Sequence, residues 1–200
     1  MLRPNWTMKI IIVCLCLAFA ASIGLAQSPA PNISEQATKL AAESEAYCVT
    51  TAANGKPTPQ EIMDKINQAC SLLEKEGSQA FPKFLGKDSP FIFKGTYLWV
   101  HNMEGIMVLH PIKPTLIGKM QINMKDKNGK LFFAAMNKLA LEKGEGWVSY
   151  MWERPGKKGE YALRTSYIKK CKTSDGKMLV VGCGDFDLEK PLAAMGVNPM

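Results

Sequence analysis

The stretch FKGTYLWVHNMEGIMVLHP, residues 93–111, decides the fold of this chain. Apolar and polar residues alternate in it with the period of two that is typical of a β-strand, on both sides of the turn-forming residues 102–105. We therefore predict a β-hairpin with strands at 96–101 and 106–110. A symmetric turn would place six side chains on one face, in the cross-strand pairs His101–Ile106, Trp99–Val108 and Tyr97–His110.

The two faces of this predicted hairpin differ in character. One face carries aromatic side chains with polar tips, and the other is apolar and suited to packing against a helix; the apolar set is Leu98, Val100, Met107 and Leu109. In this register His101 and His110 lie four residues apart along the strand, about 13 Å at a rise of about 3.3 Å per residue. The hairpin alone therefore predicts no metal site shared by the two histidines.

Helical periodicity precedes the hairpin. Apolar residues spaced three and four positions apart predict an amphipathic helix at 34–48 that ends by Thr50. The sequence TPQE, which begins at Thr58, is a capping box with proline at the first helical position. It predicts a second helix, which Gly77 ends.

One helix and three strands are expected after the hairpin. The apolar residues within 131–139 predict the helix, with Asp126 or Asn128 as its N-cap and Gly144 as its stop. The strands are predicted at 146–152, 161–169 and 177–182. This order predicts an α+β domain with a central antiparallel sheet and an N-terminal helix or helix pair on one face.

The first 26 residues have the layout of a secretory signal peptide: basic residues, an apolar run and a small-residue site that ends at Ala26. Cleavage there predicts a periplasmic or secreted protein, and an uncleaved signal would tether the chain to a membrane. After the signal we expect a leader with the first helix at 27–57, one domain at 58–190 and a loose tail at 191–200.

Two of the six cysteines lie within the signal, which leaves an even set of four in an exported protein. Such a set favours disulfides over a zinc site built from widely spaced thiols. Three pairings are open, and local spacing favours Cys48 with Cys70 and Cys171 with Cys183.

Charge and motifs exclude several classes of function. The formal net charge is +7, but basic residues are interleaved with acidic ones, which argues against a nucleic-acid groove. The sequence contains no G-x-S-x-G, H-E-x-x-H or glycine-rich phosphate loop. We therefore predict no enzyme, no metal and no cofactor. Cys183 is a candidate nucleophile, for which a disulfide-bonded or buried state is the favoured interpretation.

Later strands add further aromatic residues with polar tips. Tyr150, Trp152 and Tyr167 extend the aromatic set, and Lys169 lies two residues after Tyr167 and hence on the same side of its strand. Aromatic walls with one cation and a few hydroxyl or imidazole donors suit a small carboxylate. By the same alternation Trp147 and Trp152 face opposite ways, so at least one of them belongs to the core.

Several ordered blocks of the sequence resemble the single Cache domains, the PAS-like extracytoplasmic sensor modules of bacterial chemoreceptors and kinases. The similarity runs over about residues 80–187. It is carried by SPFIFKGTYLWVHNMEGIMVLHPIKPTLIGK (89–119), DKNGKLFFAAMNKLALEKGEGWVSYMWERPG (126–156), TSYIKK and VVGCGDF. The resemblance implies a long N-terminal helix on an antiparallel sheet of five or six strands, with a small-ligand pocket on the opposite sheet face. The two-helix start departs from the single long helix usual in the family.

The resemblance also implies a ligand class, since many such modules bind acetate, propionate, lactate or pyruvate. Carried over by position, the candidate ligand-binding residues are Trp99, His101, His110, Tyr150, Trp152, Tyr167 and Lys169. Lys169 and Tyr167 rank first for the carboxylate, and Trp99 and Trp152 for the walls.

No second membrane span or signalling domain follows the sensor pattern, so the expected function is a stand-alone binding protein. It would capture a small organic acid and present it to a membrane receptor or transporter. The alternatives are a ligandless module that docks on a membrane partner and a cysteine-dependent enzyme. The sequence carries no indication of oligomeric state.

Overall fold

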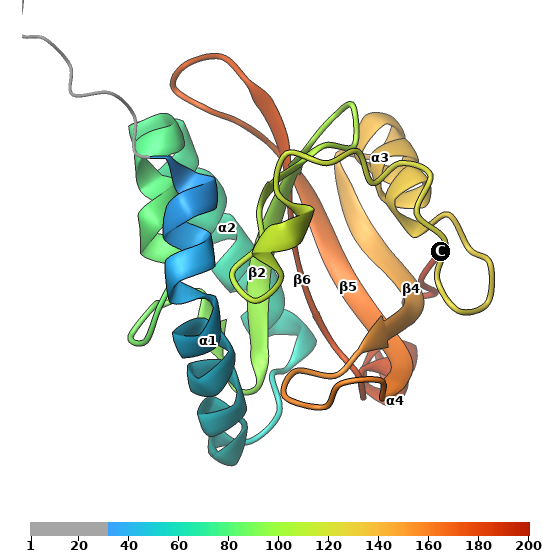
Figure 1. Ribbon diagram of the computed structural model, residues 1–200. Coiled ribbons are helices and arrows are strands. Elements are labelled where there is room, and N and C mark those ends of the chain that lie inside the picture. Colours follow the sequence, from blue (N-terminus) through green and yellow to red (C-terminus); the bar gives the residue numbers. More distant parts are fainter. Residues whose placement is uncertain (1–31) are drawn as a thin grey trace, which may run out of the picture.

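The computed structural model describes residues 32–200, so the predicted signal peptide lies outside the described residues. The described chain forms a curved antiparallel sheet with helices on both sides (Figure 1). Helices α1 (Ile33–Thr51) and α2 (Pro59–Glu76) lie on one side and α3 (Phe132–Glu142) on the other. The predicted α+β class is therefore confirmed.

The sheet has the strand order β1-β2-β6-β5-β4, and β3 also pairs with β2. The strands are β1 (Ile92–Phe93), β2 (Thr96–Asn102), β3 (Met107–Leu109), β4 (Glu145–Glu153), β5 (Tyr161–Lys172) and β6 (Met178–Asp185). The short helices are η1 (Ala52–Asn54), η2 (Gly77–Phe84), η3 (Pro114–Leu116) and α4 (Glu189–Ala194). No helix within residues 32–200 combines the length and the apolar character that crossing a membrane requires.

Local sequence signals set most of the element boundaries. The predicted capping box is present, because Thr58 Oγ1 accepts the Glu61 N–H and the Glu61 carboxylate accepts the Thr58 N–H. Gly77 ends α2 with a φ of 59°, as predicted. The N-cap prediction for α3 is wrong: Leu131 occupies that position, and Asp126 instead accepts the backbone N–H groups of Asn128 and Lys130.

The register of the opening hairpin differs from the prediction. The turn is where the sequence places it, since the Gly105 N–H donates to the Asn102 carbonyl at 3.0 Å. A β-bulge after Val100, however, pairs His101 with Met107 and Val100 with Leu109. The Asn102 side chain accepts the Ile106 N–H at 2.7 Å and so adds a contact that a symmetric turn lacks. The predicted cross-strand pairs are therefore wrong, and Met107 packs on the same side as Trp99.

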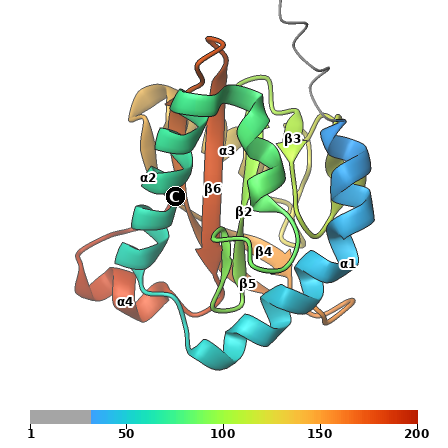
Figure 2. The ribbon, with the colours of Figure 1, turned by 90° about the vertical axis from the view of Figure 1, so that its left-hand side faces the viewer.

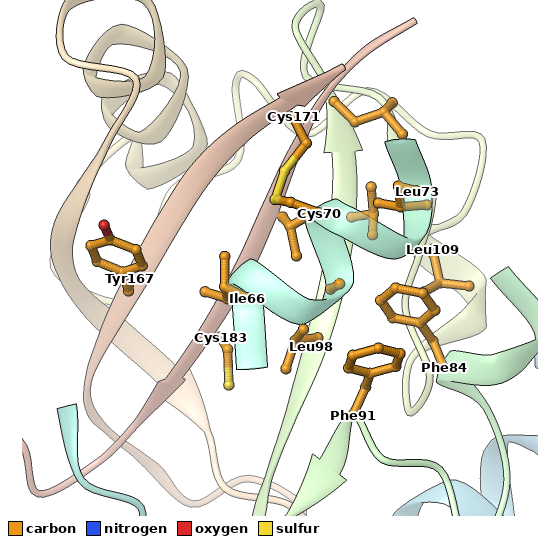
Figure 3. Packing of buried hydrophobic residues seen from close by; sticks show 14 of the residues in the cluster. Ile66, Cys70, Leu73, Phe84, Phe91, Leu98, Leu109, Tyr167, Cys171 and Cys183 are labelled. Carbon is orange, nitrogen blue, oxygen red and sulfur yellow. A yellow bond between two sulfur atoms is a disulfide. The ribbon is translucent and has the colours of Figure 1, made fainter. Parts of the chain in front are cut away.

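Helix α2 covers one side of the sheet, here called the α2 face (Figure 2). This face is a dense apolar layer (Figure 3). Alternate strand residues such as Leu98, Val181 and Tyr167 meet Ile66 and Leu73 of the helix there. The hairpin residues Leu98, Val100 and Leu109 join this cluster, which confirms that one hairpin face packs against a helix.

One disulfide crosses the α2 face, between Cys70 of α2 and Cys171 of β5, with their Cα atoms 5.5 Å apart (Figure 3). Cys48 and Cys183 are free and buried. The predicted pairs Cys48–Cys70 and Cys171–Cys183 are wrong, because α2 runs across the sheet and brings Cys70 over β5. The pairing follows that helix–sheet contact and not the spacing in the sequence.

The residues expected to form a loose tail are held in place. Helix α4 buries Leu192 completely. The Met200 N–H donates to the Trp147 carbonyl and the Ser149 N–H donates to the Met200 carbonyl, both at 2.9 Å. Lys130 Nζ donates to the carbonyls of Ser149 and Met200 at 2.7 Å each. The outer edge of β4 is thus capped at these positions.

Candidate ligand site on the aromatic face

The side of the sheet toward α3, here called the aromatic face, gathers most of the predicted site residues. Strand alternation places Tyr97, Trp99 and His101 of β2 there, together with Tyr150 and Trp152 of β4. His110, which follows β3, adds its ring 5.1 Å from that of Tyr97. Five of the seven predicted residues therefore share this face or its border.

Tyr167 and Lys169 lie on the opposite side. The Tyr167 ring packs 5.1 Å from that of Trp147 in the α2 face. Lys169 Nζ donates to Asn67 Oδ1 of α2 at 2.8 Å and pairs with Glu145 at 2.9 Å. The expectation that these two residues join the aromatic face is wrong, because β5 pairs with β6, and β6 with β2, in a register that sends odd-numbered β5 residues toward α2.

An arginine that sequence analysis missed lies at the centre of the aromatic face. Arg164 is 1% exposed. Its Nε and Nη2 donate to the Gly184 carbonyl at 3.2 and 3.0 Å, Nη2 donates to Thr96 Oγ1 at 3.2 Å, and Nη1 donates to Tyr97 Oη at 2.8 Å. These bonds engage four of the five guanidinium N–H groups and leave one on Nη1.

The charge of Arg164 is not met by a carboxylate. None of the ion pairs in residues 32–200 involves this side chain. Its guanidinium carbon instead lies 4.6 Å from the ring centre of Tyr97 and 5.1 Å from that of Trp99. Cation–π contacts compensate only part of the desolvation of a buried charge.

Tyr97 connects this buried cation to a cavity. Its hydroxyl oxygen accepts N–H groups from Arg164 and, at 3.0 Å, from Trp152. Two N–H donors fill both lone pairs, so the hydroxyl proton is available to an acceptor. A cavity of about 400 Å³ lies against Tyr97, and its wall also includes Glu45, Ile112, Lys113, Glu153, Arg154, Pro155, Gly156 and Lys158.

This cavity, here called the Tyr97 cavity, lies where α1, the segment after β3 and the β4–β5 hairpin meet. Glu45 of α1 accepts the Gly156 N–H at 3.0 Å and so joins the helix to the hairpin. Lys113 forms an ion pair with Glu153 and lies 5.4 Å from the Trp152 ring centre. These three segments and Tyr97 of β2 therefore build the site, and contacts made by the Glu45 and Lys113 side chains hold the segments together.

His110 adds a donor beside Tyr97. Its Nδ1 accepts the Lys113 N–H at 2.9 Å, so the proton of the neutral ring is on Nε2. Burial, together with the positive charges of Arg164 and Lys113, lowers the pKa of His110 well below its usual value. His110 is therefore a neutral imidazole at physiological pH, with an Nε2–H to donate.

Residues deeper on the aromatic face secure α3. His101 Nε2 lies 2.9 Å from Asn137 Oδ1, while Asn137 Nδ2 donates to the Met103 carbonyl. The Asn137 oxygen must then accept, which makes His101 Nε2 the donor. Burial lowers the pKa of His101 to about 4 against the opposing effect of this hydrogen bond. The Tyr150 hydroxyl lies 3.0 Å from Ser166 Oγ, and burial raises its pKa to about 12.

The strand register was the signal that could have identified Arg164. It pairs with Tyr150 across β4 and β5 and has the same parity as Ser166 and Ile168, which lie on the aromatic face. An arginine at an inward position between apolar neighbours is rare without a partner. The position of Arg164 identifies it as a site residue only when the even-numbered residues of β5 are assigned to the aromatic face.

The two free cysteines within residues 32–200 offer no reactive thiolate. Burial raises the pKa of Cys183 to about 12, and the pKa of Cys48 to the same value. Both therefore remain protonated at neutral pH.

Comparisons with known proteins point to one family. The model of the Single Cache domain 2 family matches residues 32–197. The methyl-accepting chemotaxis protein McpP of Pseudomonas putida is 33% identical over 76 residues, which are 38% of this chain and 14% of that protein. The chain thus spans a small part of the length of that curated relative.

Two solved structures are also similar. A periplasmic sensor domain of a chemotaxis protein is 26% identical, with a TM-score of 0.43, over 79% of this chain and 99% of that one. A Cache chemosensory domain solved to explain carboxylic acid recognition is 23% identical, with a TM-score of 0.45, over 77% of this chain and 92% of that one. Because the family model covers most of its length, this chain belongs to the Single Cache domain 2 family of sensor domains.

Proposed function

We propose that this Cache domain binds a small organic acid in the Tyr97 cavity and acts as an extracytoplasmic sensor or binding protein. The ligand carboxylate would accept the Tyr97 hydroxyl proton and balance the charge of Arg164. One observation carries the proposal: a fully buried arginine without a carboxylate donates to a tyrosine hydroxyl whose own proton is available next to a cavity.

Electrostatics favours an anion at this place. A buried charge is destabilising unless an opposite charge or strong hydrogen bonds compensate it. The Tyr97 hydroxyl, with its oxygen polarised by the Arg164 N–H, is a stronger donor than an isolated phenol. The neutral His110 ring packs 5.1 Å from that of Tyr97 but is not among the residues that line the cavity. A carboxylate has four lone-pair positions, one of which would accept the Tyr97 hydroxyl proton.

The cavity also restricts the class of acid. Its volume of about 400 Å³ leaves ample room for a small organic acid, and Ile112 supplies an apolar wall. Two carboxylates, those of Glu45 and Glu153, line it as well. A second carboxylate on the ligand would meet these charges, so we favour monocarboxylates such as acetate, propionate, lactate or pyruvate over dicarboxylates.

The candidate residues of the aromatic face have distinct roles in this proposal. Trp152 holds the Tyr97 hydroxyl in place through its Nε1–H, and Trp99 packs against Arg164. His101 and Tyr150 act indirectly, because they hold α3 and β5 in position. A loaded domain would then present the acid, or the conformation that it stabilises, to a membrane receptor or transporter.

The test uses a pair of ligands that differ only in charge. We expect propionate to raise the melting temperature of the purified protein in a dose-dependent manner, and the isosteric amide propionamide to leave it unchanged at the same concentration and ionic strength. The variant Arg164→Gln should lose the response to propionate. Equal responses to both compounds, or no propionate binding at millimolar concentration by calorimetry, would contradict the proposal.

A further inference from the structure

A second, smaller cavity lies on the other side of the contact between α1 and the β4–β5 hairpin. Its volume is about 210 Å³. Its wall combines residues of α1, the β1–β2 turn, the β4–β5 hairpin and the end of β6, among them Cys48, Val49, Lys94, Arg154, Asp185 and Phe186. Arg154 also borders the Tyr97 cavity, but the other side chains named here do not.

The wall of this second cavity, here called the Asp185 cavity, contains a buried carboxylate that is only weakly paired. Asp185 is 4% exposed, and its Oδ2 atom is buried with no hydrogen-bond partner in the described part of the chain. Its ion pair is a long one, to Lys56, whose Nζ lies 4.0 Å from Oδ2. A buried carboxylate oxygen left without donors is destabilising, and it is a strong acceptor for any donor that reaches it.

The cations around the cavity are engaged elsewhere. Lys56 forms its short ion pair with Asp187, and Lys94 pairs with Glu61. Arg154 and Lys157 both pair with Glu160, at 3.3 and 3.5 Å. Among the charged side chains that line the Asp185 cavity, Asp185 therefore has the longest ion pair, and its Oδ2 atom accepts no hydrogen bond within residues 32–200.

We propose that the Asp185 cavity is a binding site for a small primary ammonium compound, whose N–H groups donate to Asp185 Oδ2. A primary ammonium supplies both a positive charge in close contact with Oδ2 and up to three donors in a compact group, which a neutral alcohol does not. A metal ion is a poorer match, because residues 32–200 contain no cluster of three metal-ligating side chains. The inference is independent of the carboxylate proposed for the Tyr97 cavity.

Lys56 gives the site an internal competitor. Its side chain is 62% exposed, and its ammonium is bonded to Asp187 while lying 4.0 Å from the buried oxygen. A modest rotation would let the same ammonium bond Asp185 instead. An external amine must displace that alternative, so removal of the Lys56 charge should strengthen amine binding.

The experiment compares ethylammonium with tetramethylammonium, a cation of the same charge that has no N–H donor, in calorimetric titrations of the full chain at constant ionic strength. We expect ethylammonium to bind and tetramethylammonium not to bind. Asp185→Asn, which keeps the shape of the side chain, should weaken ethylammonium binding at least tenfold. Lys56→Gln should tighten it several-fold, and the response of both variants to propionate should not change.

Three results would overturn the inference. The first is equal binding of the two cations, which would indicate a general ionic effect. The second is ethylammonium binding that Asp185→Asn leaves unchanged. The third is binding that occurs in Lys56→Gln but not in the natural sequence, which would show that Lys56 itself occupies the site. A retained melting transition with propionate verifies in each case that the variant is folded.

Discussion

The α2 face and the aromatic face are built from alternate residues of the same strands, yet they bury different chemistry. Leu98 and Val100 point into an apolar layer that a disulfide crosses, whereas Tyr97, Trp99 and His101 between and beside them point toward a buried arginine and hydrogen-bonded rings. The aromatic face also contains two buried nitrogens, Trp99 Nε1 and His101 Nδ1, that have no hydrogen-bond partner within residues 32–200. The two faces of one sheet therefore differ in the polar groups that they bury.

The largest change in stability is expected from removal of the disulfide in the α2 face. The bridge joins residues 101 positions apart and therefore restricts the conformational entropy of the unfolded chain strongly. The double variant Cys70→Ser, Cys171→Ser removes this restriction and should lose about 4 kcal/mol of unfolding free energy. Urea unfolding of the variant and of the natural protein measures the difference. If the Tyr97 cavity is independent of the α2 face, propionate affinity at low temperature should not change.

A cavity in the apolar layer should have the next largest effect. Leu98 is fully buried on the α2 face, and Leu98→Ala should reduce stability by about 3 kcal/mol. The matched measurement is propionate affinity under conditions where the variant is folded, and we expect it to be retained. A coupled loss of affinity would show that the two faces do not act separately.

The buried histidines of the aromatic face predict a loss of stability in acid. The pKa of His101 is about 4 in the folded state and about 6.5 in the unfolded chain, so the unfolded state takes up the proton first as the pH falls. Full stability is present above pH 6.5, and His101 alone should remove about 2 kcal/mol between pH 7 and pH 5. His101→Gln should flatten this dependence in urea unfolding; an unchanged slope would place the proton uptake elsewhere.

The smallest effect is expected at the surface of the α2 face. Lys169 is a partly exposed member of an ion pair with Glu145, and Lys169→Ala should change stability by less than about 1 kcal/mol. Because its ammonium points toward Asn67 of α2, we also expect unchanged propionate affinity. Weakened binding in a titration of this variant would return Lys169 to the ligand site.

The comparison of the faces also explains what the sequence could predict. Contacts between near neighbours in the sequence determine the helix limits at Thr58 and Gly77, the turn at 102–105 and the strands. Hydrophobic periodicity and capping motifs reflect these local contacts directly. The bulge after Val100 and the bridge between Cys70 and Cys171 depend on how distant segments pack, and spacing along the chain does not encode that.

The candidate site shows the same division. Period two identified Tyr97 and Trp99 as members of one face, and the family resemblance added Trp152, but the assignment of β5 required its register against β4 and β6. Without that register, Lys169 ranks first as the cation that binds the carboxylate. The sequence does not single out Arg164, which lies five residues earlier and has the opposite parity. The register of a single strand decides which basic residue is buried with the aromatic rings.

The central claim is that propionate binds at Tyr97 on the aromatic face. It is tested most directly by removing one tyrosine hydroxyl from each face and measuring the propionate affinity of Tyr97→Phe and of Tyr167→Phe. Each change removes one oxygen from a buried tyrosine and keeps its ring. The account predicts that Tyr97→Phe weakens propionate binding at least tenfold, because a charge-assisted hydrogen bond typically contributes about 1.5–3 kcal/mol, while Tyr167→Phe binds as the natural protein does. Retained affinity in Tyr97→Phe, with a loss in Tyr167→Phe, would contradict the account and move the site to the α2 face.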